Sequence, residues 1–111
     1  MLNQIAGQLE RYMDLLSARQ KLVASNIANA DTPGYQTRDL DFQQEFLQSA
    51  GLMPQVMDVT GLQTKNDGNN VSLDREARLL SENALRFSGA SQLMRSQLRE
   101  VRSAIQEGRS G

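Results

Sequence analysis

The sequence predicts a mainly all-α protein, in which long N- and C-terminal helices form a coiled-coil layer. An irregular segment, with a short helix and possible short β strands, joins the two helices. Apolar residues recur at alternating steps of three and four near both ends of the chain, the spacing of helices that pair through a seam. Between these stretches Pro33 and Gly34 interrupt the pattern, and Pro33 disfavours helical geometry at Thr32. We therefore expect a single domain over residues 1–111, divided into an N-terminal helix over 1–32, a connecting segment over 33–70 and a C-terminal helix over 71–107.

The N-terminal segment carries a heptad seam from its second residue. Seven of its nine positions are apolar. The nine positions are Leu2, Ile5, Leu9, Tyr12, Leu16, Arg19, Val23, Asn26 and Ala30. Met13, Leu15 and Leu22 lie beside the seam and widen the stripe beyond what a two-stranded coiled coil needs. We expect this helix to contact more than one neighbour, whereas an ordinary amphipathic helix would face only its own core.

The stretch SNIANADTPGY ends this helix and turns the chain. Pro33 followed by Gly34 suits a type II turn, because Pro presets φ at the second position and Gly accepts positive φ at the third. Asn26 and Asn29 share a helical face, from which their amides can reach backbone groups near the turn. Asn26 also falls on the seam, where a buried polar residue can fix helix register. Tyr35 is expected to anchor the exit of the chain against the neighbouring helix.

The connecting segment holds a short predicted helix. Asp41 can cap its start, and Gln44 completes a pattern that resembles a capping box. Phe42, Phe46 and Leu47 fall on one side of this helix. The glycine and proline that follow, at positions 51 and 54, interrupt the pattern.

Residues 55–70 mix β-branched and turn residues, so we expect a loop or short strands there. Asp67 and Gly68 could close a hairpin if the preceding stretch pairs with another strand. A calcium loop is excluded, because aligning Gly68 with the invariant loop glycine puts Gln63 and Lys65 at ligating positions.

In the C-terminal segment, apolar periodicity returns over ten positions, of which only one is polar. These are Leu73, Ala77, Leu80, Ala84, Phe87, Ser91, Met94, Leu98, Val101 and Ile105. Ser72 can cap the start of this helix, and Gly108 marks its end. At 1.5 Å per residue the helix would span about 50 Å.

A second apolar face lies behind this seam, at Leu79, Leu85 and Leu93. Pairing with one helix alone would leave these leucines in water, so a second apolar partner is implied. The sequence does not tell whether the long helices pair within one chain or between chains. In either case the two helices are expected to pack against further chains.

The composition argues against catalysis. The chain has no His, Cys or Trp, which removes His-based triads, Cys nucleophiles and the usual zinc ligand sets, so we predict no catalytic, cofactor-binding or metal-binding residue. Asp39 and Asp41 are better read as solvated acids at a helix start than as a catalytic pair. Twelve basic and 13 acidic residues give a net charge of -1, which argues against nucleic-acid binding. The first residues resemble neither a cleaved signal nor a membrane span.

The stretch SNIANADTPGY, at positions 25–35, resembles the N-terminal signature of flagellar axial proteins. Its signature residues are Asn26, Asn29, Thr32, Pro33, Gly34 and Tyr35. That family places the signature at the end of an N-terminal helix and closes the chain with a long C-terminal helix. RDLDF at 38–42 and DGNNVSLDREARLLSENALRF at 67–87 are similar to the basal-body rod proteins of this family, especially those of the proximal rod.

This resemblance implies a structural subunit of the bacterial flagellar rod, polymerising through coiled-coil helices into a drive shaft that crosses the periplasm and transmits torque. It implies type III export without a cleaved signal peptide, and one axial domain. The partners it implies are other copies, other rod proteins, the basal-body adaptor FliE, and the inner-membrane ring or export gate, with no small-molecule substrate. The alternative is a soluble helical adaptor module that binds a partner helix.

Overall fold

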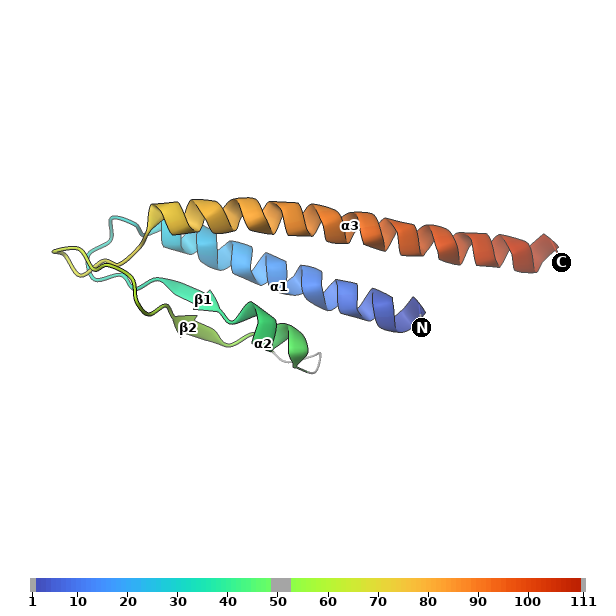
Figure 1. Ribbon diagram of the computed structural model, residues 1–111, viewed down its shortest axis with the longest axis horizontal. Helices are drawn as coiled ribbons and strands as arrows, with labels where there is room; N and C mark the ends of the chain where they lie inside the picture. The colour runs from blue at the N-terminus through green and yellow to red at the C-terminus, as the bar shows by residue number, and fades with distance from the viewer. Residues whose placement is uncertain (1, 49–52, 111) are drawn as a thin grey trace.

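The computed structural model describes residues 2–48 and 53–110, with side chains from 4 to 48 and from 53 to 109. Its elements, in chain order, are α1 (Leu2–Ala28), β1 (Arg38–Leu40), α2 (Phe42–Leu47), β2 (Val56–Asp58) and α3 (Leu73–Ser110). The molecule is long and narrow, with extents of 71 × 24 × 17 Å (Figure 1). The predicted all-α class is confirmed, including the short helix and the short strands. The predicted break at position 51 lies outside the described residues.

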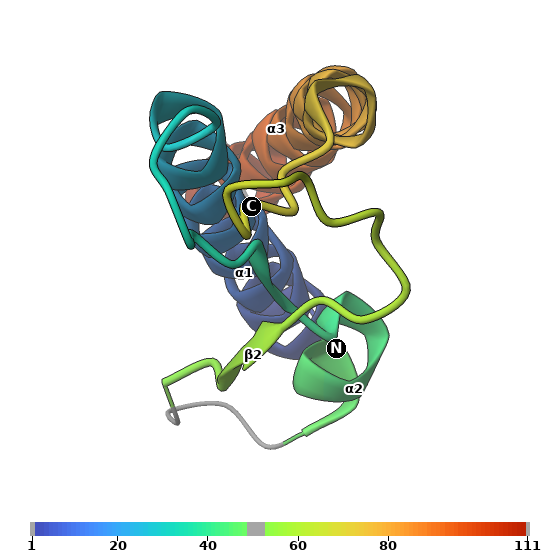
Figure 2. The same ribbon diagram turned by 90° about the vertical axis from the view of Figure 1, so that its left-hand side faces the viewer.

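The two long helices, α1 and α3, lie side by side and antiparallel (Figures 1 and 2). Leu15, Leu16 and Val23 of α1 are buried, and Ala90 is buried on α3. These side chains form the centre of a thin core, because two helices alone enclose little space. The core is completed where the connecting segment covers α1, at Leu40.

Helix α1 ends at Ala28, four residues before Thr32. The amide of Asn29 is shared between the carbonyls of Ser25 and Asn26, at 3.1 and 3.3 Å, so the last turn tightens and the helix does not continue. The chain then turns between Thr32 and Tyr35, closed by a 3.2 Å bond from the Tyr35 amide to the Thr32 carbonyl. Gly34 has a φ of 76°, as a type II turn requires at this position.

The connecting segment forms an arm, made of β1, α2 and β2, that runs alongside α1 (Figure 1). Strand β1 pairs antiparallel with β2 in the register Arg38 to Asp58. The Asp41 carboxylate accepts a 3.1 Å hydrogen bond from the Gln44 amide and so caps α2, as predicted. The prediction that Leu47 lies on one side of this helix with Phe42 and Phe46 is wrong. Leu47 is 76% exposed and does not share a packed face with them.

Both of these phenylalanines pack edge-on against Tyr12 of α1, with ring centroids 5.3 and 5.7 Å away. At 3.6 residues per turn, Phe42 and Phe46 lie about 40° apart around α2, whereas Leu47 lies about 100° from Phe46 and is left outside this contact. The contact with Tyr12 holds α2 on the N-terminal half of α1.

Helix α3 begins after Ser72, whose hydroxyl accepts a 3.2 Å bond from the Arg75 amide. The helix runs on through Gly108 to Ser110, three residues past the expected end. A glycine only weakens a helix by about 1 kcal/mol relative to alanine, so it ends one only where the backbone turns left-handed. The 38 residues of α3 exceed the 27 of α1, and α3 projects past the N-terminus of α1 (Figure 1).

Candidate assembly surface

The face that α3 turns toward α1 differs from its predicted seam. Glu76, Asn83 and Ala90, spaced by seven residues, are the buried positions of α3. The seam residues Leu73, Leu80 and Phe87 each come three residues earlier, so they lie beside this buried line. The pairing of α1 with α3 inside one chain therefore leaves the seam of α3 at the rim of the contact.

Of the seven large apolar residues in the seam of α3, six remain 39–57% exposed, and Met94 is half-buried. The exposed ones are Leu73, Leu80, Phe87, Leu98, Val101 and Ile105. The seam of α1 is turned inward instead. Leu16 and Val23 are buried, and Ile5, Leu9 and Tyr12 are half-buried, whereas the side chain of Leu2 lies outside the described residues.

The three leucines predicted as a second apolar face do not lie together. Leu79 is half-buried, Leu93 is 57% exposed and Leu85 is 76% exposed. The reason is rotation: at 3.6 residues per turn, Leu79 points closer to α1 than Leu85 does. Leu85 therefore stands on the outer surface of the helix pair.

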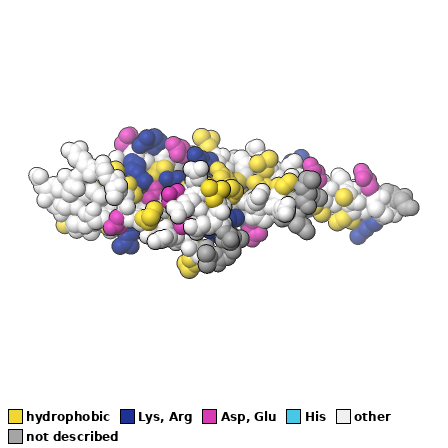
Figure 3. Space-filling model, turned by 60° about the horizontal axis from the view of Figure 1, so that its bottom comes forward, with side chains coloured by type: hydrophobic (Ala, Val, Ile, Leu, Met, Phe, Trp, Pro, Cys, Tyr) yellow, Lys and Arg dark blue, Asp and Glu magenta, His cyan; other side chains and the backbone are white. Residues whose placement is uncertain are grey.

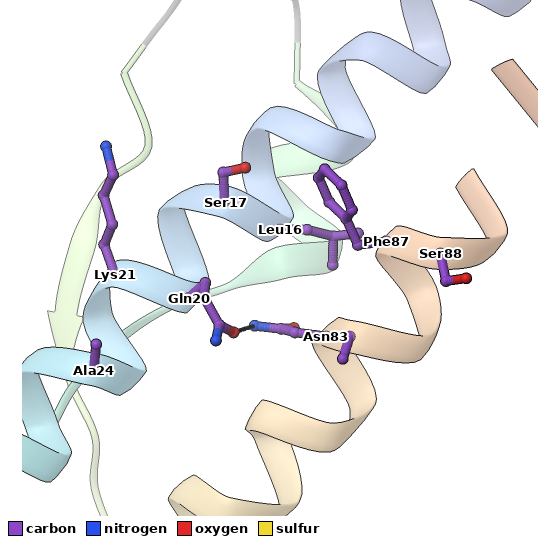
Figure 4. Close-up of a pocket in the computed structure, with 9 residues that line it drawn as sticks. Leu16, Ser17, Gln20, Lys21, Ala24, Asn83, Phe87 and Ser88 are labelled. Carbon is purple, nitrogen blue, oxygen red and sulfur yellow. Dashed lines mark hydrogen bonds between the residues drawn. The ribbon is translucent and has the colours of Figure 1, made fainter. Parts of the chain in front are cut away.

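Two apolar grooves run between the long helices. The larger, of about 600 Å³, lies between Leu16 and Ala24 of α1 and Ala84 and Phe87 of α3 (Figure 4). Beside these residues, the Asn83 amide donates a 3.2 Å hydrogen bond to the carbonyl oxygen of the Gln20 side chain.

The second groove, of about 440 Å³, is lined by Leu9, Tyr12 and Phe46 together with Ala90 and Leu93. Its walls come from α1, α2 and α3, so the arm contributes to it through Phe46. Apolar grooves beside a row of exposed apolar side chains are surfaces that another helix can cover.

A cluster of polar side chains, which we call the polar junction, joins α1, β1 and α3. Its members are Arg19, Asn26, Tyr35, Asp39, Arg75 and Glu76. Asn26 is 1% exposed, and both the nitrogen and the oxygen of its side-chain amide form hydrogen bonds. Its nitrogen donates to the Arg38 carbonyl and to Glu76 Oε1, both at 2.8 Å. Its oxygen accepts bonds from the Tyr35 hydroxyl, at 2.9 Å, and from the Arg38 amide, at 3.1 Å.

The prediction that Asp39 is a solvated acid is wrong, because its side chain is buried. Its carboxylate accepts two bonds from Arg19, at 3.1 and 3.0 Å, and one from Arg75, at 2.6 Å. Two guanidinium groups satisfy the carboxylate on both oxygens, which offsets the cost of burying it. The strand β1 is thereby fastened to both long helices.

Glu76 is fully buried between the helices. Its Oε1 accepts bonds from Asn26 and from Arg75, at 2.8 and 2.9 Å, whereas its Oε2 has no hydrogen-bond partner. Burial raises the pKa of this carboxyl above its ordinary value; the Arg75 charge and the hydrogen bonds from Asn26 and Arg75 oppose that rise, and the Asp39 charge adds to it.

The remaining signature residues hold the turn against the segment before α3. Asn29 donates to the Ser25 carbonyl at 2.9 Å and accepts a 3.0 Å bond from the Thr32 hydroxyl. Asn69, which is fully buried, donates to the carbonyls of Asn29 and Thr32 at 2.9 and 2.8 Å. Pro33 itself is exposed.

Sequence reasoning missed Glu76 and Asn69, and it missed the burial of Asp39. The sequence held one sign of the buried Asp39. Arg19 interrupts the otherwise apolar seam of α1, and a charged residue there needs a buried anion as its partner. No such signal marked Glu76, which falls outside the predicted seam.

A family model for the flagella basal body rod protein matches residues 13–36, from the middle of α1 to the end of the turn. The flagellar basal body rod protein FlgB of Yersinia enterocolitica is 31% identical, over 97% of this chain and 100% of that protein. The FlgB proteins of Salmonella typhimurium and Escherichia coli K12 are 32% and 30% identical, over 86% of this chain and 88% of each relative. The relatives therefore span the arm and both long helices, beyond the signature alone. On this similarity the chain belongs to the FlgB family of flagellar basal body rod proteins.

Proposed function

We propose that this structural subunit of the proximal rod polymerises through the apolar faces that a single chain leaves open. Its family makes it a structural protein of the flagellar basal body, which assembles with other rod components and is not an enzyme. The polymer would be the drive shaft of the flagellum, with residues 1–111 acting as one axial domain.

The observation that carries this proposal is the apolar surface of α3. Eight large apolar side chains of this helix are 39–76% exposed: Leu73, Leu80, Leu85, Phe87, Leu93, Leu98, Val101 and Ile105. A soluble monomer rarely leaves so many large apolar side chains uncovered along one element, whereas an assembly covers them. Since Leu85 and Leu98 point in different directions, more than one neighbour is needed.

The proposed export route, compartment and neighbours of the chain rest on the family resemblance. We propose that the chain leaves the cytoplasm by flagellar type III export without a cleaved signal peptide and assembles in the periplasm, where the rod transmits torque. FliE and the inner-membrane ring or export gate would be its neighbours there. Within the described residues, no helix is long and apolar enough to cross a bilayer.

Leu85→Asp and Leu98→Asp test the proposal on two faces. Each substitution should block rod assembly, because it puts a carboxylate where a neighbouring chain would bury the leucine. The measurement is swimming motility of cells that carry the variant, with rod formation checked in isolated basal bodies by electron microscopy. Gln92→Asp is the matched control, since it adds the same charge to an exposed polar position of α3. Normal swimming of Leu85→Asp cells would show that no second interface covers this face.

A further inference from the structure

The outer edge of the small sheet is open. Strand β1 lies between β2 and α1 (Figures 1 and 2), and among the described residues β2 has a strand neighbour on one side only. Figure 3, in which the lower side of Figure 1 comes forward, shows hydrophobic side chains at the surface of this side. Val56 and Met57 of β2 are 48% and 44% exposed, and Met53, just before the strand, is 91% exposed. Apolar side chains thus accompany a free strand edge.

The hydrogen bonds of the sheet show which backbone groups of β2 point outward. The Val59 amide donates a 2.9 Å bond to the Thr37 carbonyl, so these two residues form a hydrogen-bonded pair of the antiparallel ladder. Bonded and non-bonded pairs alternate, so Met57 bonds to β1, whereas Val56 and Asp58 lie in non-bonded pairs. The amides and carbonyls of Val56 and Asp58 therefore point away from β1, and within the described part of the chain they have no hydrogen-bond partner.

The opposite edge of the sheet is closed by a side chain. Arg38 of β1 lies opposite Asp58, so its amide and carbonyl also point out of the ladder. The Asn26 amide group bonds to both, at 3.1 and 2.8 Å. The fold therefore satisfies the edge of β1 and leaves the edge of β2 with donors and acceptors that a further strand can pair.

The sequence of this edge fits a second copy of itself. When two β2 edges meet antiparallel with Met57 opposite Met57, the outward groups of Val56 in each chain face those of Asp58 in the other and exchange hydrogen bonds with them. A register with Val56 opposite Val56 places Pro54, which has no amide hydrogen, opposite Asp58. A register with Asp58 opposite Asp58 sets like charges directly against each other. Of these registers, the one centred on Met57 avoids both faults.

We propose that the free chain forms a closed pair with a second copy through β2, antiparallel and centred on Met57. The pair has two-fold symmetry because each chain uses the same edge, so it ends with two chains and does not grow into a polymer. It therefore goes beyond the proposed function, which uses the apolar faces of α3. Because β2 has three residues, the pair is weak and forms at high chain concentration.

A cysteine at the centre of the strand reports the pair. In the proposed register, position 57 faces itself in a non-hydrogen-bonded pair, where the Cα atoms lie about 4.5 Å apart, within the range of a disulfide. Position 53 of one chain would lie about 27 Å from position 53 of the other, at about 3.4 Å per residue. Because the chain has no cysteine, Met57→Cys and Met53→Cys each carry a single thiol. The full-length Met57→Cys chain should form disulfide-linked dimers about tenfold faster than Met53→Cys, although Met53 is more exposed.

A proline at position 56 removes the pair selectively. Val56→Pro deletes the outward amide hydrogen and leaves the ladder with β1, in which this amide takes no part. In the Met57→Cys chain it should abolish the advantage over Met53→Cys, whereas Val56→Ile, which keeps the amide, should retain it. Equal rates at positions 57 and 53, or an advantage that Val56→Pro leaves intact, overturn the proposal.

Charges at position 56 test the register without altering the backbone. In the proposed pair this position faces Asp58 of the other chain. At low salt, Val56→Lys in the Met57→Cys chain should therefore speed dimer formation about threefold, and Val56→Glu should slow it by a similar factor. Gln55→Lys and Gln55→Glu are the matched controls, because position 55 faces the uncharged Val59 and should change the rate less.

Equal effects at positions 55 and 56 would show that the register is wrong. The proposed function is tested separately, because the pair does not depend on the polymer. Chains that polymerise but show no advantage for Met57→Cys contradict only the β2 pair, whereas paired chains that never polymerise contradict only the proposed function.

Discussion

At the scale of single residues, the polar junction shows how a thin protein fastens its parts. Asn26 makes four hydrogen bonds that link α1 to β1, to Tyr35 and to Glu76 of α3. Asp39 joins Arg19 and Arg75 from different helices. Where two helices enclose little apolar core, directional bonds of this kind decide which positions face each other.

Glu76 should make the stability of the chain depend on pH in a direction that its burial sets. Its pKa is raised above the ordinary value of 4.5, so folding favours the protonated carboxyl. The free energy of unfolding should therefore rise as the pH is lowered from neutral toward 4.5, and fall as the pH climbs through the raised pKa. Urea unfolding of the wild type and of Glu76→Gln, compared at both ends of this range, measures the effect.

The comparison isolates Glu76, because other carboxylates titrate in both proteins. Relative to the glutamine variant, the wild type should gain stability on acidification. Glu82→Gln, on an exposed glutamate of the same helix, should behave like the wild type. A wild type that loses stability relative to Glu76→Gln would mean that the charge of Arg75 outweighs burial.

At the scale of elements, the register of α1 against α3 depends on contacts at one end of the pair. Asn26 and Glu76 meet at the junction, and the Gln20 and Asn83 amides meet further along. Two apolar grooves open along the rest of the contact. Such a contact can slide by a turn unless polar groups forbid it.

Asn26→Leu should keep both helices but loosen their register. The substitution leaves Glu76 and Tyr35 without their buried partner, at a cost of about 2–4 kcal/mol. A cysteine pair at positions 20 and 83, in a chain that otherwise has none, reports the register through its rate of disulfide formation. The pair should close more slowly with Asn26→Leu while circular dichroism keeps its helical signal.

Asn66→Leu is the control for this experiment, since Asn66 is exposed in the loop before α3. If Asn26→Leu leaves the rate of disulfide formation unchanged, Asn26 stabilises only the local turn and does not set the register of the helices.

At the scale of the whole molecule, order should decrease away from the junction. Buried hydrogen bonds hold the junction end of the helix pair together. At the other end, α3 extends beyond the N-terminus of α1. Large apolar side chains along α3 are exposed on the single chain. We expect a subunit of this kind to complete its fold only in the polymer.

Circular dichroism of the dilute chain should therefore show less helix than the 27 residues of α1 and 38 of α3 require. Helicity should increase with concentration as chains assemble and cover the exposed apolar side chains of α3. Cooperative unfolding of a fully helical monomer would contradict this expectation and favour a self-contained adaptor module instead.

The sequence by itself determined the fold class, because heptad spacing, the Pro33–Gly34 turn and the Asp41 and Ser72 caps act over a few neighbouring residues. It also determined that the chain has more apolar surface than one helix pair can cover. Only the tertiary structure decided which face of α3 meets α1. Leu80 offered a better seam than Asn83, yet Asn83 is buried, because the hydrogen bonds of Asn26 with Glu76 and of Gln20 with Asn83 favour the rotation that keeps polar partners together. Those bonds join residues 50 or more positions apart, so no local sequence pattern predicts them.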